Sequence, residues 1–246
     1  MSKLSEAFSK RKALITYITA GDPDLATTEK LIYKLEEAGA DIIELGIPFS
    51  DPLADGPVIQ ASHQRALKKK VSLADVFRLV RKVRKKTQVP IVFMLAYNLA
   101  AQYGPKKFHE DMEKYGVDES IVPDLPPEEA SYKGVYLVAP TSTDERIKKV
   151  AEMSTGFIYL ISVAGITGKR NKLDEDIAGL VSRIRKYSDL PVAVGFGIST
   201  PAQAKEVSRL ADGVIVGSAI VDLIAKRKYK AVSKFAASLR RAIDAR

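Results

Sequence analysis

Two carboxylates, Glu44 and Asp55, stand out by where they fall in the sequence. Glu44 interrupts the apolar run 42–45, which has the composition of a strand covered on both faces. A charge in such a strand is costly unless it has a partner or a task, because burial disfavours the ionised form. Asp55 lies in the proline-rich segment 48–57 that follows. We expect the two acids to face one pocket from different elements, as general acid–base chemistry requires.

Glycine-rich stretches end the last three predicted strands, at 165–168, 195–197 and 217–218. Glycine lets backbone N–H groups approach an anion without a Cβ in the way. Gly195 and Gly197, taken singly, are equally explained by tight turns. Together with a helix starting after the last strand, the three stretches favour a phosphate site.

Other polar residues at strand ends are open to two interpretations. The periodicity favours Tyr159 as a core residue over a ligand contact. Asp51 and Asp124 can each cap a turn, because an acid in a proline-rich segment favours turns. We expect the two histidines to lie at the surface, with His63 exposed or facing a partner and His109 solvated.

The strands that position these residues are predicted from apolar runs bounded by turn residues. We expect a helix in the first dozen residues, with Leu4 and Phe8 on one face. Strands are expected at 13–20, 41–47, 90–95, 119–124, 134–140, 157–162, 191–197 and 213–218, alternating with helices that include 27–38, 106–115, 143–153, 173–187 and 229–245. Without a GxGxxG fingerprint after the first strand, this alternation favours a (βα)8 TIM barrel of one domain, residues 1–246, over a doubly wound sheet. The predicted connection between strands four and five, residues 126–134, is too short for a full crossover helix.

Composition narrows the class of protein. The 246 residues include no cysteine, which excludes disulfides and thiolate metal sites, and two isolated histidines are too few for a histidine-rich metal site. The net charge of +9 comes from basic residues at helical spacing without interleaved aromatic residues. We expect solvated helix faces, or a partner surface or anion steering, rather than nucleic-acid binding. No apolar run suits a membrane span and no signal core is present, so we expect a cytoplasmic protein.

The block ELGIPFSDPLADGPVIQ, starting at Glu44, closely resembles the tryptophan synthase alpha chain family. The resemblance covers almost the whole chain and includes YITAGDPD, VPDLPPEE, LVAPTSTDERI, GFIYLISVAGITG and VAVGFGIS. It implies a barrel lyase that cleaves indole-3-glycerol phosphate to indole and glyceraldehyde 3-phosphate in tryptophan biosynthesis. It further implies no metal or cofactor in this chain, and an αββα complex with a beta chain that holds pyridoxal phosphate.

The resemblance also assigns residues. Glu44 and Asp55 match the family's catalytic pair. The implied substrate-binding residues are Tyr17, Thr19, Ile59, Met94, Tyr159 and Thr167, the last in a lid at 167–173, and the implied phosphate contacts are Gly168, Phe196, Gly197, Gly217 and Ser218.

Two departures from the family pattern are visible. Ala96 replaces a tyrosine that the family usually places two residues before the asparagine matched by Asn98, beside the catalytic aspartate. The helix between strands four and five is cut short. The residues alone leave room for a barrel acting on another sugar phosphate, a stand-alone indole-glycerol-phosphate lyase, or a weakly active regulatory subunit.

Overall fold

Eight parallel strands form one curved sheet in the order β4-β3-β2-β1-β8-β7-β6-β5. The computed structural model describes residues 2–52, 55–162, 170–195 and 197–245. The strands are β1 Ala13–Thr19, β2 Ile42–Gly46, β3 Ile91–Met94, β4 Glu119–Ile121, β5 Leu137–Val138, β6 Ile158–Ile161, β7 Val192–Gly195 and β8 Gly213–Val216. This order, with β1 between β2 and β8, is that of the predicted TIM barrel.

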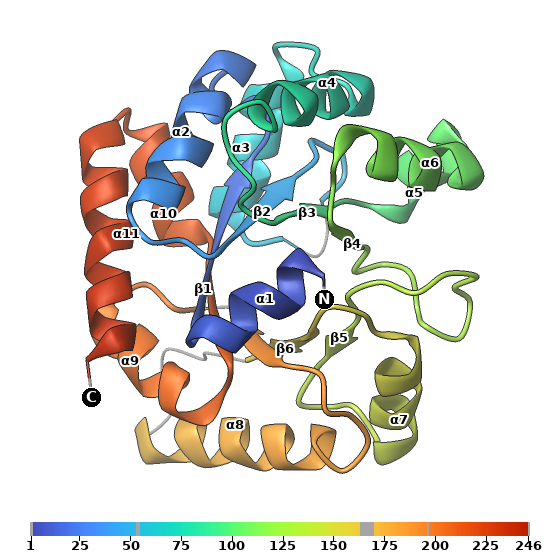
Figure 1. Cartoon of the computed structure of the whole chain (residues 1–246), viewed down its shortest axis with the longest axis vertical. Coiled ribbons are helices and arrows are strands. Elements are labelled where there is room, and N and C mark those ends of the chain that lie inside the picture. Colours follow the sequence, from blue (N-terminus) through green and yellow to red (C-terminus); the bar gives the residue numbers. More distant parts are fainter. Residues whose placement is uncertain (1, 53–54, 163–169, 196, 246) are drawn as a thin grey trace.

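Helices surround the sheet (Figure 1). They are α1 Lys3–Lys10, α2 Leu25–Glu37, α3 Pro57–Leu67, α4 Leu73–Val83, α5 Tyr97–Tyr103, α6 Pro105–Tyr115, α7 Asp144–Met153, α8 Arg170–Ile184, α9 Pro201–Leu210, α10 Ser218–Ala225 and α11 Tyr229–Asp244. The predicted helices are present, and α5 was not predicted. The capping sequences at Ser72 and Thr200 form complete capping boxes, which fix where α4 and α9 begin.

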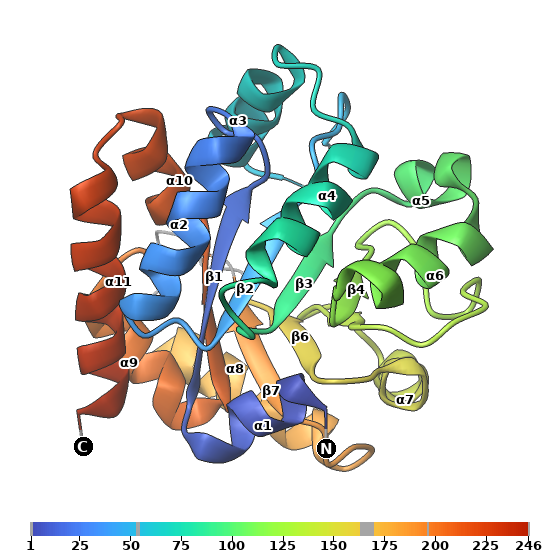
Figure 2. The same ribbon diagram turned by 45° about the horizontal axis from the view of Figure 1, so that its top comes forward.

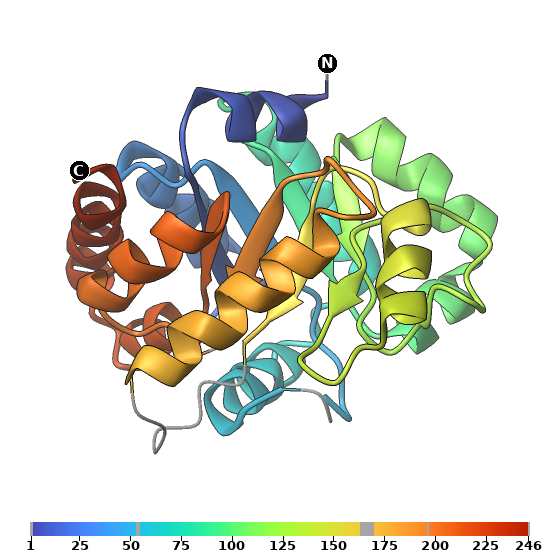
Figure 3. The same cartoon turned by 90° about the horizontal axis from the view of Figure 1, so that it is seen from below.

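Helix α1 closes the N-terminal end of the barrel. Leu4 is buried with the inward-facing residues of the strands, and the rings of Phe8 and Phe157 lie 5.5 Å apart. Figures 2 and 3 show α1 at one end of the strands and α3 at the other. The open end is therefore the C-terminal one, where barrels of this type place their sites.

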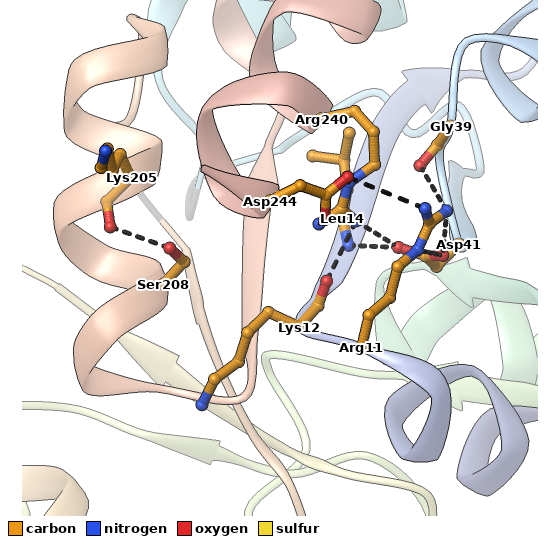
Figure 4. Close-up of polar contacts among 9 residues, drawn as sticks. All are labelled: Arg11, Lys12, Leu14, Gly39, Asp41, Lys205, Ser208, Arg240 and Asp244. Carbon is orange, nitrogen blue, oxygen red and sulfur yellow. Dashed lines mark hydrogen bonds and ion pairs between the residues drawn. The ribbon is translucent and has the colours of Figure 1, made fainter. Parts of the chain in front are cut away.

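Charged side chains lock the same N-terminal end. Arg240 of α11 is 6% exposed and donates to Asp41, to the Lys12 carbonyl and to Asp244 (Figure 4). Arg11 donates to the other oxygen of Asp41 at 2.9 Å. These bonds join the last helix to the residues that precede β1 and β2.

The barrel closes weakly between β4 and β5. One isolated bridge, between Ile121 and Val135, joins these strands in the described part of the chain. Residues 122–136, all of which the structure describes, form turns and bridges but no helix. Figure 1 shows this loop between α6 and α7. The prediction of a shortened connection is confirmed, and β4 and β5 are shorter than expected where no helix connects them.

The basic residues lie where solvated helix faces were expected. Eight of them are exposed: Arg78, Arg81, Lys82, Lys85, Lys226, Arg227, Lys228 and Lys230. Among the described residues, no helix combines the length and apolar character needed to cross a membrane.

Candidate active site

Glu44 lies inside the barrel, in β2, with Tyr17 of β1 and Val92 of β3 beside it in the sheet. Its side chain is 1% exposed and its Oε2 has no hydrogen-bond partner among the described residues. Burial, and then the charge of Asp55, raise the pKa of Glu44 from 4.5 to about 8. The carboxyl group therefore holds a proton near neutral pH.

Asp55 approaches from the loop that precedes α3. Its backbone is held by a bond from its N–H to the Pro52 carbonyl and by the Gln60 amide, which donates to the Asp55 carbonyl at 2.8 Å. Its carboxylate is 20% exposed and lies 3.4 Å from Nε2 of His63. This partly solvated acid differs from Glu44 in environment, which is the arrangement that separates the roles of two carboxyl groups.

A cavity of about 180 Å³ opens between these acids and the ends of β7 and β8. Eight of its lining residues come from the first part of the chain or the strands, and the other six from the loop after β7 and the start of α10. The lining consists of Tyr17, Glu44, Asp55, Gly56, Ile59, Met94, Tyr159, Gly197, Ile198, Ser199, Ile215, Gly217, Ser218 and Ala219. The structure thus brings together nine of the residues singled out from the sequence.

Two tyrosine rings pack at the C-terminal end of the barrel, each directly against a glycine at the end of a neighbouring strand. A Cβ on Gly46 would lie 2.1 Å from the Tyr17 hydroxyl, and a Cβ on Gly195 would lie 2.3 Å from the Tyr159 hydroxyl. Glycine at these two positions therefore admits a phenol ring. Burial raises the pKa of both phenols, so both stay neutral. Tyr159 is buried, as its periodicity predicted, and it also lines the cavity.

The far end of the cavity is built from backbone. Gly197 has φ +76°, a conformation that favours glycine. Helix α10 begins after Gly217, which makes no side-chain cap bond. The Ile220 N–H donates to the Gly217 carbonyl, so the Ser218 and Ala219 N–H groups are the ones left for another acceptor, and helix N-termini suit anions. Ile198, Ser199 and Ala219 complete this end and were not singled out from the sequence.

Some predicted site residues lie elsewhere. Thr19 is 2% exposed and sits behind Tyr17, with its hydroxyl 3.2 Å from the phenol. Asn98 is an exposed residue of α5, and Asp124 accepts the Tyr97 N–H at the start of that helix. Thr167, Gly168 and Phe196 lie outside the described residues.

The prediction of a surface-exposed His63 is wrong. His63 is 4% exposed and lies against Asp55. The signal was present in the sequence, because Ile59, Ser62, His63 and Ala66 follow helical spacing and all four are buried in α3. His109 is partly buried rather than solvated, and its Nε2 has no partner in the described part of the chain.

Within the described ranges, no group of three or more histidine, aspartate or glutamate side chains is placed to hold a metal ion. The acids of the cavity therefore stand as a pair, without further ligand side chains around them among these residues.

The fold and the cavity at the C-terminal ends of the strands define a TIM-barrel protein. The family model of the tryptophan synthase alpha chain matches residues 4–244. The chain belongs to the tryptophan synthase alpha chain family, and is thereby an enzyme of the lyase type.

Individual relatives agree with this assignment. The tryptophan synthase alpha chain of Citrifermentans bemidjiense is 51% identical, over 92% of this chain and 90% of the relative. That of a Thermoanaerobacter species is 49% identical, over 94% and 93%. A crystal structure of the alpha chain from Legionella pneumophila superposes with a TM-score of 0.91 at 36% identity, over 99% and 98%. These likenesses do not favour a regulatory subunit or another sugar-phosphate barrel.

Proposed function

We propose that this chain cleaves indole-3-glycerol phosphate by a retro-aldol reaction to indole and glyceraldehyde 3-phosphate, with Glu44 and Asp55 as the catalytic residues. One observation carries the proposal. A buried acid, whose Oε2 has no hydrogen-bond partner in the described ranges, lines the same cavity as a second acid on a separate element. A buried polar group without a partner is costly, so its retention is explained by a reacting ligand.

Glu44 acts first as the acid. With its pKa raised to about 8 by burial, it holds the proton that C3 of the indole ring must receive before the carbon–carbon bond breaks. The resulting carboxylate then takes the proton of the glycerol hydroxyl. The bond to C3 breaks, its electron pair returns to the ring, and the hydroxyl carbon becomes the aldehyde.

The Asp55 carboxylate accepts the indole N–H. Protonation at C3 places positive charge on the ring nitrogen, and a fixed carboxylate there stabilises this charge as it develops. Tyr17, Ile59, Met94 and Tyr159 provide the apolar lining against which the ring packs. Gly197, Gly217 and Ser218 bind the phosphate, which supplies binding energy away from the reacting atoms. Thr19 supports Tyr17 from behind.

The partner of this chain is a tryptophan synthase beta chain in an αββα complex. A crystal structure of tryptophan synthase from M. tuberculosis in an aminoacrylate-bound form superposes on this chain with a TM-score of 0.89 at 33% identity. The resemblance assigns pyridoxal phosphate to the beta chain and passage of indole to it. The alpha chain needs no cofactor for acid–base cleavage.

The test is the release of indole from indole-3-glycerol phosphate by the purified chain, alone and with a beta chain, with glyceraldehyde 3-phosphate measured in parallel. We expect equal amounts of the two products. No indole release under either condition would overturn the proposed reaction.

A further inference from the structure

We propose that His63 is a positioning residue, which holds the Asp55 carboxylate in place and ties it to the loop after β2. The inference rests on the proposed function, because it assigns the means by which one of the two acids is oriented. His63 lies on the buried face of α3 and is 4% exposed. Its imidazole reaches three groups, two from the loop between β2 and α3 and one from β1.

The first contact fixes the tautomer of the ring. The backbone N–H of Phe49 donates to Nδ1 of His63 at 3.0 Å. An Nδ1 that accepts a bond carries no proton, so the neutral ring has its proton on Nε2. The imidazole therefore presents an N–H donor on the side that faces the cavity.

The second and third contacts are made by this donor. Nε2 lies 3.4 Å from Oδ2 of Asp55 and 3.4 Å from the Tyr17 hydroxyl. Among the residues that the structure describes, His63 is the side chain that approaches the Asp55 carboxylate as a donor. The Gln60 contact reaches only the Asp55 carbonyl and leaves the carboxylate free to rotate.

A chain of hydroxyl groups supports the same direction. Ser62 donates its single proton to the Ile59 carbonyl at 2.6 Å, so it accepts from Thr19, 2.5 Å away. Thr19 has then used its proton and accepts from Tyr17. The Tyr17 oxygen thus turns a lone pair toward His63, which matches a proton on Nε2.

His63, Asp55 and Ala96 also line a second cavity, of about 380 Å³. The methyl group of Ala96 can form no hydrogen bond. Movement of Phe49 is therefore passed through the imidazole to Asp55, so anything that orders this loop also orders the carboxylate.

Three variants test the contacts of Nδ1 and of Nε2 separately. His63→Leu removes both contacts, His63→Asn keeps an acceptor where Nδ1 was, and His63→Gln keeps an N–H donor near the Nε2 position. We expect kcat for indole release to fall about tenfold in the Leu and Asn variants, with KM within about twofold, and to return to within about threefold of the parent in the Gln variant.

Gln64→Leu is the matched control, because Gln64 is an exposed neighbour on α3 that reaches the same loop at the Ser50 carbonyl. Its kcat should stay within about twofold of the parent. If His63→Leu does not fold, the Asn and Gln variants still decide. An active Asn variant with an inactive Gln variant, or unchanged kcat in both, would overturn the inference while the reaction stands. A parent chain that releases no indole removes the proposed function and this inference together.

Discussion

Asp41 and Glu44, just before β2 and within it, are three residues apart but differ in their hydrogen-bond partners and in the end of the barrel that they face. Asp41 accepts hydrogen bonds from Arg11, Arg240 and the Leu14 N–H at the closed end of the barrel. Glu44 faces the open end, and its Oε2 has no partner among the described residues. Both side chains are largely withdrawn from water.

The difference shows how one fold separates stability from chemistry. A buried charge whose partners are in place is tolerated, and removal of one partner is strongly destabilising. A buried acid without partners instead takes up a proton, which raises its pKa and makes it a proton donor. The N-terminal end thus keeps the barrel closed, and the C-terminal end holds a group that stability alone does not explain.

The largest expected effect is on catalysis. Glu44→Gln should lower the rate of indole release by more than about 10²-fold, because the amide keeps the shape but transfers no proton. Binding of a phosphate-bearing substrate analogue should stay within about threefold, and the variant should be no less stable than the parent at neutral pH, because glutamine carries no proton to lose on unfolding. Steady-state kinetics, calorimetry and urea unfolding measure the three quantities. Near-normal turnover would show that Glu44 is not the acid.

The next largest effect is expected at the closed end. Arg240→Leu should lower the free energy of unfolding by about 3 kcal/mol, because Asp41 and Asp244 lose a buried partner. The rate of cleavage should not change. Lys234→Leu, at an exposed position of the same helix, should shift stability by less than about 0.5 kcal/mol. Equal urea midpoints for the two variants would remove the structural role given to Arg240.

The pH dependence of stability should distinguish the two acids further. The pKa of Glu44 is about 8 in the folded chain against the ordinary value of 4.5, so the folded state binds one proton more than the unfolded state between these pH values. Its stabilising contribution is full below pH 4.5 and is lost as pH rises through about 8. Relative to Glu44→Gln, the parent should lose a few kcal/mol across this window. If the free energy of unfolding varied with pH in the same way for the parent and for Glu44→Gln, the raised pKa of Glu44 would be contradicted.

The smallest effect is expected from the partner. A beta chain that orders the loop carrying Asp55 should raise the rate of cleavage about tenfold, or about 1.4 kcal/mol. The gain should be smaller in His63→Leu, which uncouples the loop from the carboxylate. Titration of a beta chain into a fixed amount of alpha chain measures both. If mixing the two chains produced no complex and no change in rate, the alpha chain would be a stand-alone lyase.

The sequence predicted site residues best where they lie at or just after the C-terminal end of a recognisable strand. Glu44 could be placed because an acid in an apolar strand is conspicuous, and Asp55 because the loop after that strand must return over the same face. Helix α5 could not be foreseen, since its first N–H is capped by Asp124 from another part of the chain. Thr19 and Tyr17 look alike at a strand end, and only packing decides which of them lines the cavity.

The seam at Ile121 and Val135 gives the barrel a preferred place to come apart. Neighbouring strands elsewhere share several backbone bonds, whereas these two are joined in the described part of the chain by one bridge, and no helix connects them in residues 122–136. Local unfolding begins where such contacts are fewest. The amide protons of β4 and β5 should therefore be among the first of the sheet to exchange with deuterium. The loop 126–133 is equally the place where a new segment of chain could be inserted, or new termini opened, at the least cost to the rest of the barrel.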